Sequence, residues 1–526
     1  MSEQKSIFSN DPSENNIDNQ IDIKLQNRQE EFTNESNLTD IKKRVIDHSL
    51  SLSNDARSRL FKNKRLQAKI SLNVTQSLES KLTIPKDFYQ LCQNTEINPS
   101  MLQEIVTCFR TNDIQTKYKG LVGLRKILSL PTNPPFQEII DLQLVPEFIS
   151  LLGNSYPEFE YEALWCLTNI SSGTSDQANS ILVKGGLEKI MNLMNSKIEE
   201  VQHQAIWALG NLAGDSSKIR DSIINQGGYD RLLNVFSTTN NKNIVKQCVW
   251  ALSNFFRVKP IMSYEYVHKS LDYILKSINL YFDDDELLVD ACWILSSMSE
   301  NYKKIIKDIL NSNILPKLIL CLQKDNATIV ISCLRIVGNI AAGDANQTQM
   351  LLDNGILDKL KLTIFHKKKS IRKESAWIIS NIASGTQRQI ETLIEQQFMP
   401  LLTEVINNDE VEIQREVIWA ICNLTSVEKN EYIETLFKQG IVDVICKCLH
   451  NSEAKHLAVS LEALGNLLSY GKKYAEAHGG DNPVVQKIEQ LGMFDKLESL
   501  QLYPVEVVYE KVIKLLETYF DTENAN

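Results

Sequence analysis

The chain has 526 residues, and its 66 acidic and 56 basic side chains give a formal net charge of −10. Its 43% hydrophobic and 23% charged residues are typical of a folded, water-soluble protein. This length exceeds what one compact core usually supports, unless the chain is an array of repeats with a continuous core. No stretch approaches a membrane-spanning length of apolar residues, and the N-terminus lacks an apolar signal sequence. We therefore expect no membrane interaction and a location in the cytosol or nucleus.

The residue patterns of common enzymes and metal sites are missing from the sequence. The ten cysteines are scattered among apolar residues without a Cys-x-x-Cys pair, as expected for small buried side chains in a reducing compartment. The seven histidines form neither a His-Glu-x-x-His pattern nor a cluster with cysteines, and the glycines match no nucleotide-binding pattern. The sequence therefore predicts a protein that is not an enzyme and needs no metal or cofactor.

The N-terminal region divides into two segments of opposite charge. Residues 1–40 are rich in Asn, Ser, Gln, Asp and Glu and carry a net charge of −6, so we expect a disordered tail. Residues 41–81 carry +7, and this basic segment extends to about residue 85. Such asymmetry indicates binding to an acidic surface, either the body of this protein or a partner, whereas a solvated basic linker is the simpler alternative.

From about residue 100 the chain repeats itself. Successive blocks such as Leu164–Asn169, Ile206–Asn211 and Val249–Asn254 recur at intervals of 42 or 43 residues. Each unit contains an apolar helix, which in five units carries a Trp-x-x-x-Asn pattern, then a loop marked by glycine and a second amphipathic helix, and no β alternation is visible. Units of this length with two or three helices are typical of HEAT and armadillo repeats. The pattern therefore predicts that residues 86–520 form an all-α solenoid of about ten repeats, followed by a tail at 521–526.

The Trp and Asn of each unit lie one helical turn apart, so they project from the same face. In stacked units we expect the tryptophans to form parallel indole walls, between which the stem of a lysine or arginine fits with a cation–π contact at its charged end. The asparagine offers both a donor and an acceptor to an extended peptide backbone. A single such pair is usually structural, but its repetition at one position favours a binding surface for extended basic peptides.

The pairs form two groups separated by a gap. The first run is Trp165/Asn169, Trp207/Asn211 and Trp250/Asn254, and the second run is Trp377/Asn381 and Trp419/Asn423. Between them the unit of Trp293 has Ser297 in place of Asn, and the next unit has Arg335 in place of Trp. Acidic residues near these positions are candidates to pair with peptide cations. These acidic residues are Asp215, Glu286, Asp290, Glu374 and Glu416.

These strings resemble the importin-α family, the adaptors that bind lysine- and arginine-rich nuclear localisation signals. The resemblance extends from about residue 100 to 520 and includes Ala205–Ser216, Trp250–Arg257 and Ile488–Gln501. It implies a right-handed armadillo-repeat superhelix with a flexible N-terminal segment, and shuttling between cytoplasm and nucleus. The implied partners are localisation-signal peptides of cargo proteins, importin-β and the nuclear export receptor for importin-α, with no direct binding of nucleic acid.

The resemblance also implies which residues bind the peptide. The major site would consist of Trp165, Asn169, Gly173, Gln204, Trp207, Asn211, Asp215, Trp250 and Asn254, extended by Glu286 and Asp290, with Asp215 receiving the key lysine. The minor site would consist of Arg335, Asn339, Glu374, Trp377, Asn381, Glu416, Trp419 and Asn423. The segment similar to the importin-β-binding helix would use Arg57, Arg59, Lys62, Lys64, Arg65 and Lys69.

Two positions and one segment depart from the family pattern. Ala178 stands where the family has a threonine that helps the aspartate receive the lysine, and Ala345 stands where the family's minor site has an aspartate, with Asp344 one place earlier. The segment after Arg65 has few basic residues, so we expect weaker binding to importin-β and weaker autoinhibition than in the family. The alternative to a transport adaptor is a cytoplasmic armadillo scaffold that binds other extended peptides.

Overall fold

The computed structural model describes residues 99–153, 156–451 and 453–520. In these residues the chain is α-helical with short connections, and no β-strand occurs. They belong to two compact units, which divide between Asn301 and Tyr302. The expected segments 1–40, 41–85 and 521–526 lie outside the described residues, as do residues 86–98 of the expected repeat domain.

The described helices group into ten repeats of two or three helices, which confirms the expected number. The last helix of each repeat is the longest or among the longest of its repeat, and it carries the Trp-x-x-x-Asn position where that pattern is present. These helices are α6 (Ile114–Leu128), α9 (Pro157–Ile170), α12 (Glu199–Ala213), α15 (Lys242–Arg257), α17 (Asp285–Asn301), α20 (Ala327–Ala341), α23 (Lys369–Ala383), α26 (Val411–Leu424), α29 (Ala454–His478) and α32 (Glu506–Tyr519).

The remaining helices precede these and form the other layer of each repeat. In residues 99–301 they are α5 (Pro99–Phe109), α7 (Phe136–Asp141), α8 (Leu144–Ser150), α10 (Ser175–Val183), α11 (Gly186–Leu193), α13 (Ser217–Asn225), α14 (Gly228–Thr238) and α16 (Tyr264–Leu280). In residues 302–520 they are α18 (Lys303–Asn311), α19 (Leu315–Leu320) with the 3₁₀ turn η2 (Cys321–Gln323), α21 (Ala345–Asp353), α22 (Ile356–Thr363), α24 (Gln387–Glu395), α25 (Phe398–Asn408), α27 (Asn430–Lys438), α28 (Ile441–Cys448), α30 (Pro483–Gln490) and α31 (Phe494–Leu500).

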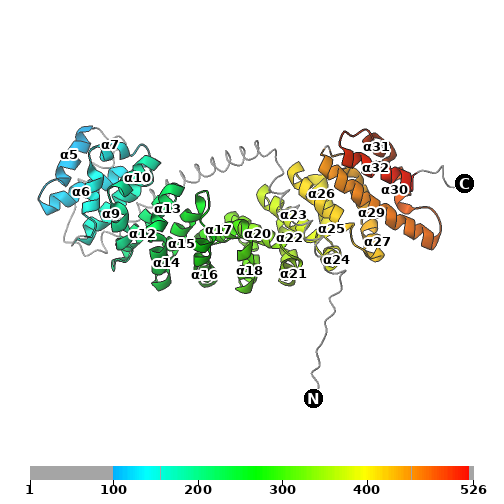
Figure 1. The fold of residues 1–526 in the computed structure, drawn as a ribbon, viewed down its shortest axis with the longest axis horizontal. Helices are drawn as coiled ribbons and strands as arrows, with labels where there is room; N and C mark the ends of the chain where they lie inside the picture. Colours follow the sequence, from blue (N-terminus) through cyan, green and yellow to red (C-terminus); the bar gives the residue numbers. More distant parts are fainter. Residues whose placement is uncertain (1–98, 154–155, 452, 521–526) are drawn as a thin grey trace, which may run out of the picture. The chain divides into compact units, whose positions relative to one another are not determined.

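Within each unit the last helices of successive repeats pack side by side (Figure 1). Helices α6, α9, α12, α15 and α17 form one such row, and α20, α23, α26, α29 and α32 form the other. Each helix is enclosed on several sides, so apolar residues such as Ala205, Leu209 and Leu212 of α12 are completely buried. The core therefore runs through each row from repeat to repeat, as in armadillo proteins.

Glycine begins the middle helix of several repeats, as the sequence predicts. Gly185 and Gly440 adopt positive φ angles of 77° and 82° directly before α11 and α28. In two other repeats Gln143 and Gln397 adopt the same left-handed conformation before α8 and α25. Glycine lowers the cost of this turn, but the stacking of the repeats imposes it even where a side chain is present.

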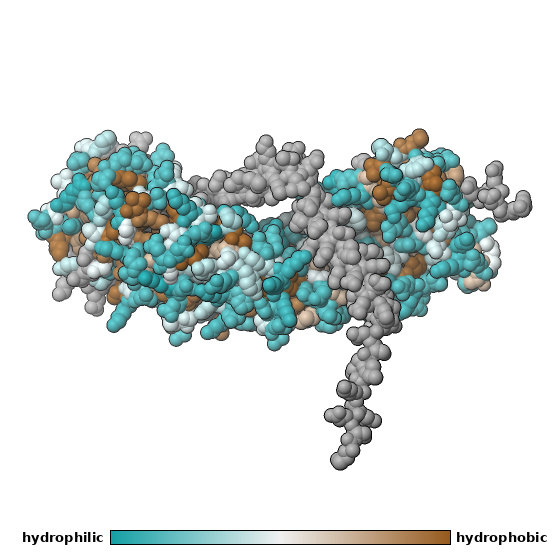
Figure 2. All heavy atoms as spheres, viewed as in Figure 1, coloured by the Kyte–Doolittle hydropathy of each residue, from teal (hydrophilic) through white to brown (hydrophobic). Residues whose placement is uncertain are grey.

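On the face shown in Figure 2 the hydrophobic residues form separate patches within a mainly hydrophilic surface. No helix of the part that the structure describes is both long and apolar enough to cross a membrane.

Candidate peptide-binding surfaces

The three Trp/Asn pairs of the first run lie on adjacent helices. Trp165, Trp207 and Trp250 project from α9, α12 and α15, which pack against one another in that order. Trp165 and Trp250 are each 6% exposed, and Trp207 is half-buried. The indoles are therefore wedged between repeats and present only an edge or part of a face to solvent.

The expectation of parallel indole walls is wrong for Trp207 and Trp250. Their ring centroids are 6.5 Å apart, but the ring planes meet at 80°, in an edge-to-face arrangement. The positive edge of one ring then meets the negative face of the other, which is favoured over a face-to-face sandwich. A cation that binds here would meet one indole face and one indole edge.

Two glycines, three positions after Trp207 and Arg335, let the indole of the following repeat pack against the helix backbone, and this role is not predicted from the sequence. A Cβ atom on Gly210 would lie 2.6 Å from Cζ3 of Trp250, and one on Gly338 would lie 2.1 Å from Cζ3 of Trp377. Each indole thus rests on the backbone of the preceding long helix. The regular spacing of Gly210 and Gly338 after Trp207 and Arg335 is the sequence signal that reveals this contact.

The asparagines also connect neighbouring repeats. Nδ2 of Asn169 donates to Oγ of Ser129 at 2.9 Å, and Nδ2 of Asn211 donates to the carbonyl oxygen of Thr168 at 3.1 Å. The amide oxygen Oδ1 of Asn211 is enclosed and accepts no hydrogen bond from the described residues. A peptide backbone that binds these asparagines would therefore have to share the side-chain amide with the hydrogen bond that links two repeats.

Gln204 and Gly173 also have roles within the fold. The side chain of Gln204 is buried and donates to Oγ1 of Thr168 at 2.8 Å. Gly173 directly precedes the N-cap of α10, Thr174, and a Cβ at Gly173 would lie 2.1 Å from Oε1 of Gln177, which accepts from the Thr174 backbone in a capping box. Glycine at this position therefore permits the cap that begins α10.

Asp215 lies beside the C-terminal end of α12, with its carboxylate close to the start of α10. Ser175 donates its hydroxyl to Oδ1 of Asp215 at 3.1 Å. Ala178 is completely buried in α10. Position 178 therefore offers no hydroxyl, and the hydroxyl that contacts this carboxylate comes from Ser175.

Arg125, from the preceding repeat, already contacts the first tryptophan of the first run, Trp165. The guanidinium carbon of Arg125 lies 4.5 Å from the ring centroid of Trp165, and Nε donates to Oε2 of Glu162 at 2.7 Å. Burial acts to lower the pKa of Arg125, but the carboxylate of Glu162 outweighs it and the pKa is raised. Neither residue was singled out from the sequence, because 37 residues separate them in the chain.

The acidic residues expected to extend the major site also have partners within the protein. Asp290 accepts from Arg257 at 3.2 Å, and the guanidinium carbon of Arg257 lies 5.1 Å from the ring centroid of Trp293. Glu286 is exposed and forms an ion pair with Lys246. The chain's own cations therefore neutralise both carboxylates, and a peptide cation would have to compete with them.

The second run lies in the other unit, on α23 and α26, which pack side by side. Trp377 and Asn381 are buried, whereas Trp419 and Asn423 are half-buried. Nδ2 of Asn423 donates to the carbonyl oxygen of Ser380 at 3.4 Å, which repeats the inter-repeat bridge of the first run.

The charged residues expected at this second site differ in exposure. Nε of Arg335, on α20, donates to Oε1 of Glu374 at 3.1 Å, and Arg335 itself is exposed. Asn339 is half-buried one turn further along α20, and Glu416 is buried on α26. Asp344 caps α21 by accepting from the Gln347 backbone at 2.9 Å, so its carboxylate is engaged next to Ala345.

The basic residues Arg57, Arg59, Lys62, Lys64, Arg65 and Lys69 lie outside the described residues. The structure thus brings together the expected residues of each run within one unit, and it leaves the N-terminal segment as a sequence prediction.

Comparison with known families agrees with the repeat architecture. Residues 132–172 and 386–426 match the family described as armadillo/beta-catenin-like repeat, and residues 482–526 match the atypical Arm repeat. Residues 177–298 match the C-terminal domain of the SIL1/FES1/HPBP1 family. An engineered protein of known crystal structure superposes with a TM-score of 0.66 over 79% of this chain and 98% of its own, at 23% identity, which supports the fold.

Three curated proteins are similar over most of their length. Importin subunit alpha-B of Dictyostelium discoideum is 44% identical over 483 residues, which cover 91% of each chain. Importin subunit alpha-1b of Oryza sativa subsp. japonica is 34% identical over 82% of this chain and 80% of its own. Importin subunit alpha-3 of Arabidopsis thaliana is 35% identical over 80% of each chain. With these identities and this coverage, and with armadillo-type repeats throughout the described residues, the chain belongs to the importin-α family.

Proposed function

We propose that the protein is a nuclear import adaptor that binds lysine- and arginine-rich localisation signals in an extended conformation. The observation that carries this proposal is the arrangement of Trp165, Trp207 and Trp250 on three adjacent helices, each with an asparagine one turn further along. Helices packed about 8–10 Å apart match the length of about three extended residues, so one peptide can contact successive pairs.

The charges beside the first run favour a cationic ligand. Asp215 is half-buried at the end of α12, where a lysine that reached it would be partly removed from water and therefore strongly attracted. Arg125 and Arg257 already lie over Trp165 and Trp293, and they serve as intramolecular examples of how a guanidinium binds these indoles. The relatives are named as importin subunits, which supports the same role.

The adaptor role also includes partners and location. We propose that importin-β engages the basic N-terminal segment, that an export receptor returns the protein to the cytoplasm, and that the protein shuttles between cytoplasm and nucleus without catalysing a reaction. The second candidate, a cytoplasmic armadillo scaffold, rests on the inter-repeat hydrogen bonds of the asparagines, which give the Trp/Asn pairs a structural use.

Fluorescence anisotropy with a labelled lysine-rich peptide tests this proposal. The unaltered chain should bind with a dissociation constant in the micromolar range or below, and Trp207→Ala/Asn211→Ala should weaken binding at least about a hundredfold. Asp215→Lys should remove binding to the first run, because a lysine there repels the peptide, and only the weaker binding to the second run should remain. Equal binding by the unaltered chain and the Asp215→Lys variant, or no binding by either, would favour the scaffold.

A further inference from the structure

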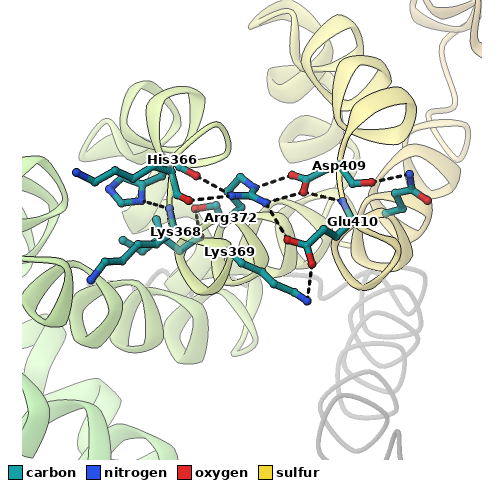
Figure 3. A network of polar contacts seen from close by, with 10 residues as sticks. His366, Lys368, Lys369, Arg372, Asp409 and Glu410 are labelled. Atoms are coloured by element: carbon teal, nitrogen blue, oxygen red, sulfur yellow. Dashed lines mark hydrogen bonds and ion pairs between the residues drawn. The ribbon is translucent and has the colours of Figure 1, made fainter.

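Two successive repeats differ at the loop that precedes their last helix. The first junction lies between the repeat that ends with α23 and the repeat that ends with α26. There Arg372, near the start of α23, forms two hydrogen bonds with Asp409, from Nε at 2.7 Å and from Nη2 at 2.8 Å (Figure 3). The same guanidinium donates to the carbonyl oxygen of His366 at 3.0 Å and lies 3.5 Å from Glu410. Both partners of this bidentate pair are mostly buried, so it closes the gap between the two repeats.

The next junction lacks this pair. At the 42-residue interval, Gln414 takes the place of Arg372, and Asn451 takes the place of Asp409. Nε2 of Gln414 donates to the carbonyl oxygens of Ile406 and Asp409, at 3.1 Å and 2.9 Å, within its own repeat. The Gln414 side chain therefore forms no bridge to the described residues of the following repeat, and a pocket of about 340 Å³ lies between the two repeats.

The walls of this pocket combine an apolar floor with basic side chains. The apolar part consists of Ile406, Val411, Ile418 and Cys448, and the polar part consists of Gln414, Arg415, Lys447, His450 and Asn451. Its volume lies at the lower end of the range for small-ligand sites. An ammonium and a guanidinium thus face one cavity in a chain whose net charge is −10.

Arg415 retains an unused donor in this wall. One end of its guanidinium forms an ion pair with Glu453, which holds the side chain in place. Its Nε is enclosed and has no hydrogen-bond acceptor among the described residues. Nζ of Lys447 donates to the amide oxygen of Asn407 at 2.8 Å, so its charge has a neutral partner there. An anionic oxygen in the pocket could accept from both groups.

The pocket is adjacent to the second run. Arg415 precedes Trp419 by four residues, so the two side chains lie on the same face of α26, one turn apart. Ile418, directly before Trp419, forms part of the pocket wall. Neighbouring side chains of an extended peptide point in opposite directions, so a residue next to a cation bound at Trp419 could turn toward Arg415.

We infer that this pocket binds a carboxylate or phosphate group of the same peptide whose basic residues contact Trp419. The second run would then prefer basic peptides that carry a glutamate, aspartate or phosphoserine beside the basic cluster. This inference rests on the proposed function, because it takes the peptide to lie across α26. The apolar floor accommodates the methylene groups of such a side chain, and the two basic groups bind its charged end.

Peptide scanning on the full chain tests the inference. The first run is disabled by Trp207→Ala/Asn211→Ala, so that anisotropy reports binding to the second run. A labelled basic peptide carries one glutamate at each of several flanking positions in turn, and each peptide is matched with its glutamine counterpart. At one position the glutamate peptide should bind about five- to tenfold more tightly than the glutamine peptide. Phosphoserine and serine at that position then distinguish phosphate from carboxylate binding.

Variants of the pocket provide the controls. Lys447→Gln should reduce the preference for glutamate to less than about twofold and leave the affinity for the glutamine peptide nearly unchanged. Arg415→Gln should have the same effect, and Lys447→Gln serves as the independent variant if loss of the pair with Glu453 destabilises the fold. Lys367→Gln/Lys368→Gln removes exposed charges outside the pocket and should keep the preference.

Each contrary outcome has a distinct meaning. If the basic peptides bind but no position favours glutamate or phosphoserine, the pocket inference is overturned and the proposed function stands. The inference is also overturned if the preference survives in both Lys447→Gln and Arg415→Gln. If no basic peptide binds either the unaltered chain or the variant with the first run disabled, the proposed function fails, and this inference fails with it.

Discussion

The guanidinium of Arg125 lies 4.5 Å from the ring centroid of Trp165 and at the same time pairs with the completely buried carboxylate of Glu162. Two successive repeats meet at this contact, because α6, which carries Arg125, packs against α9, which carries Trp165 and Glu162. The arrangement a cationic peptide would adopt on an indole is therefore already formed by the protein itself at the start of the first run.

Arg125→Met should destabilise the protein strongly. The substitution leaves the carboxylate of Glu162 buried without its cation, which typically costs about 3–5 kcal/mol of unfolding free energy. Arg125→Met/Glu162→Gln should recover most of this loss, because it removes both charges. Urea denaturation followed by circular dichroism measures the difference, and equal stability of the single and double variants would contradict the role given to this pair.

Gly210→Ala should destabilise the protein, although alanine normally favours a helix over glycine by about 1 kcal/mol. The added methyl group would lie 2.6 Å from Cζ3 of Trp250 and 3.1 Å from the backbone of Ala251, so the indole has to move. We expect a net loss of about 1–3 kcal/mol, together with weaker peptide binding.

The matched control for this change is the equivalent position of the next repeat. Ser253, three residues after Trp250, already carries a Cβ, and Ser253→Ala should alter unfolding free energy by about 1 kcal/mol or less. Tryptophan fluorescence and denaturation of the two variants provide the comparison. A Gly210→Ala variant as stable as the unaltered chain would mean that the indole of Trp250 is not held against α12.

Arg257→Gln should strengthen the binding of a long basic peptide. Arg257 lies over Trp293 and pairs with Asp290, and its side chain is 39% exposed, so a ligand can displace it. Without this internal competitor, a peptide that reaches Trp293 should bind about three- to tenfold more tightly. A short peptide confined to Trp207 and Trp250 should be unaffected, and calorimetric titration of both peptides checks the expectation. Weaker binding of the long peptide would show that Arg257 itself contacts the ligand.

The unit that begins at Tyr302 should become less stable as the solution is acidified, because it contains the buried His456. Its side chain is completely buried, with a ring centroid 6.0 Å from that of Trp419. Burial lowers the pKa of His456 below its ordinary value of 6.5, and the nearby Glu453 opposes this only in part, while Arg415 and Lys455 add to it. As pH falls through about 6.5, the unfolded chain takes up a proton more readily than the folded chain, so unfolding becomes more favourable.

Denaturation between pH 5 and 8 measures this effect. In the His456→Gln variant the part of the pH dependence that begins near pH 6.5 should be reduced, because the titrating group is gone. A histidine on the surface, such as His450, provides the control, and His450→Gln should leave that pH dependence unchanged. The same profile for the unaltered chain and His456→Gln would contradict the assignment.

Much of the fold follows from local patterns that a single sequence contains. The 42- or 43-residue interval, the Trp-x-x-x-Asn spacing and the glycines before the middle helices predict about ten helical repeats, and the structure confirms these repeats in the residues that it describes. Helical periodicity acts over a few residues and repeat length is directly countable, so neither requires knowledge of the tertiary structure.

The chemistry of that face depended on contacts between repeats. The edge-to-face packing of Trp207 and Trp250, the pairing of Arg257 with Asp290 and the pocket beside Arg415 each involve residues about 33–43 positions apart. Charges of either sign recur along the sequence, and only the three-dimensional stacking determines which carboxylates are already neutralised and which basic groups retain an unused donor. Composition and spacing therefore determined the repeats and their tryptophans, whereas the tertiary structure decided how much of each candidate site is left for a ligand.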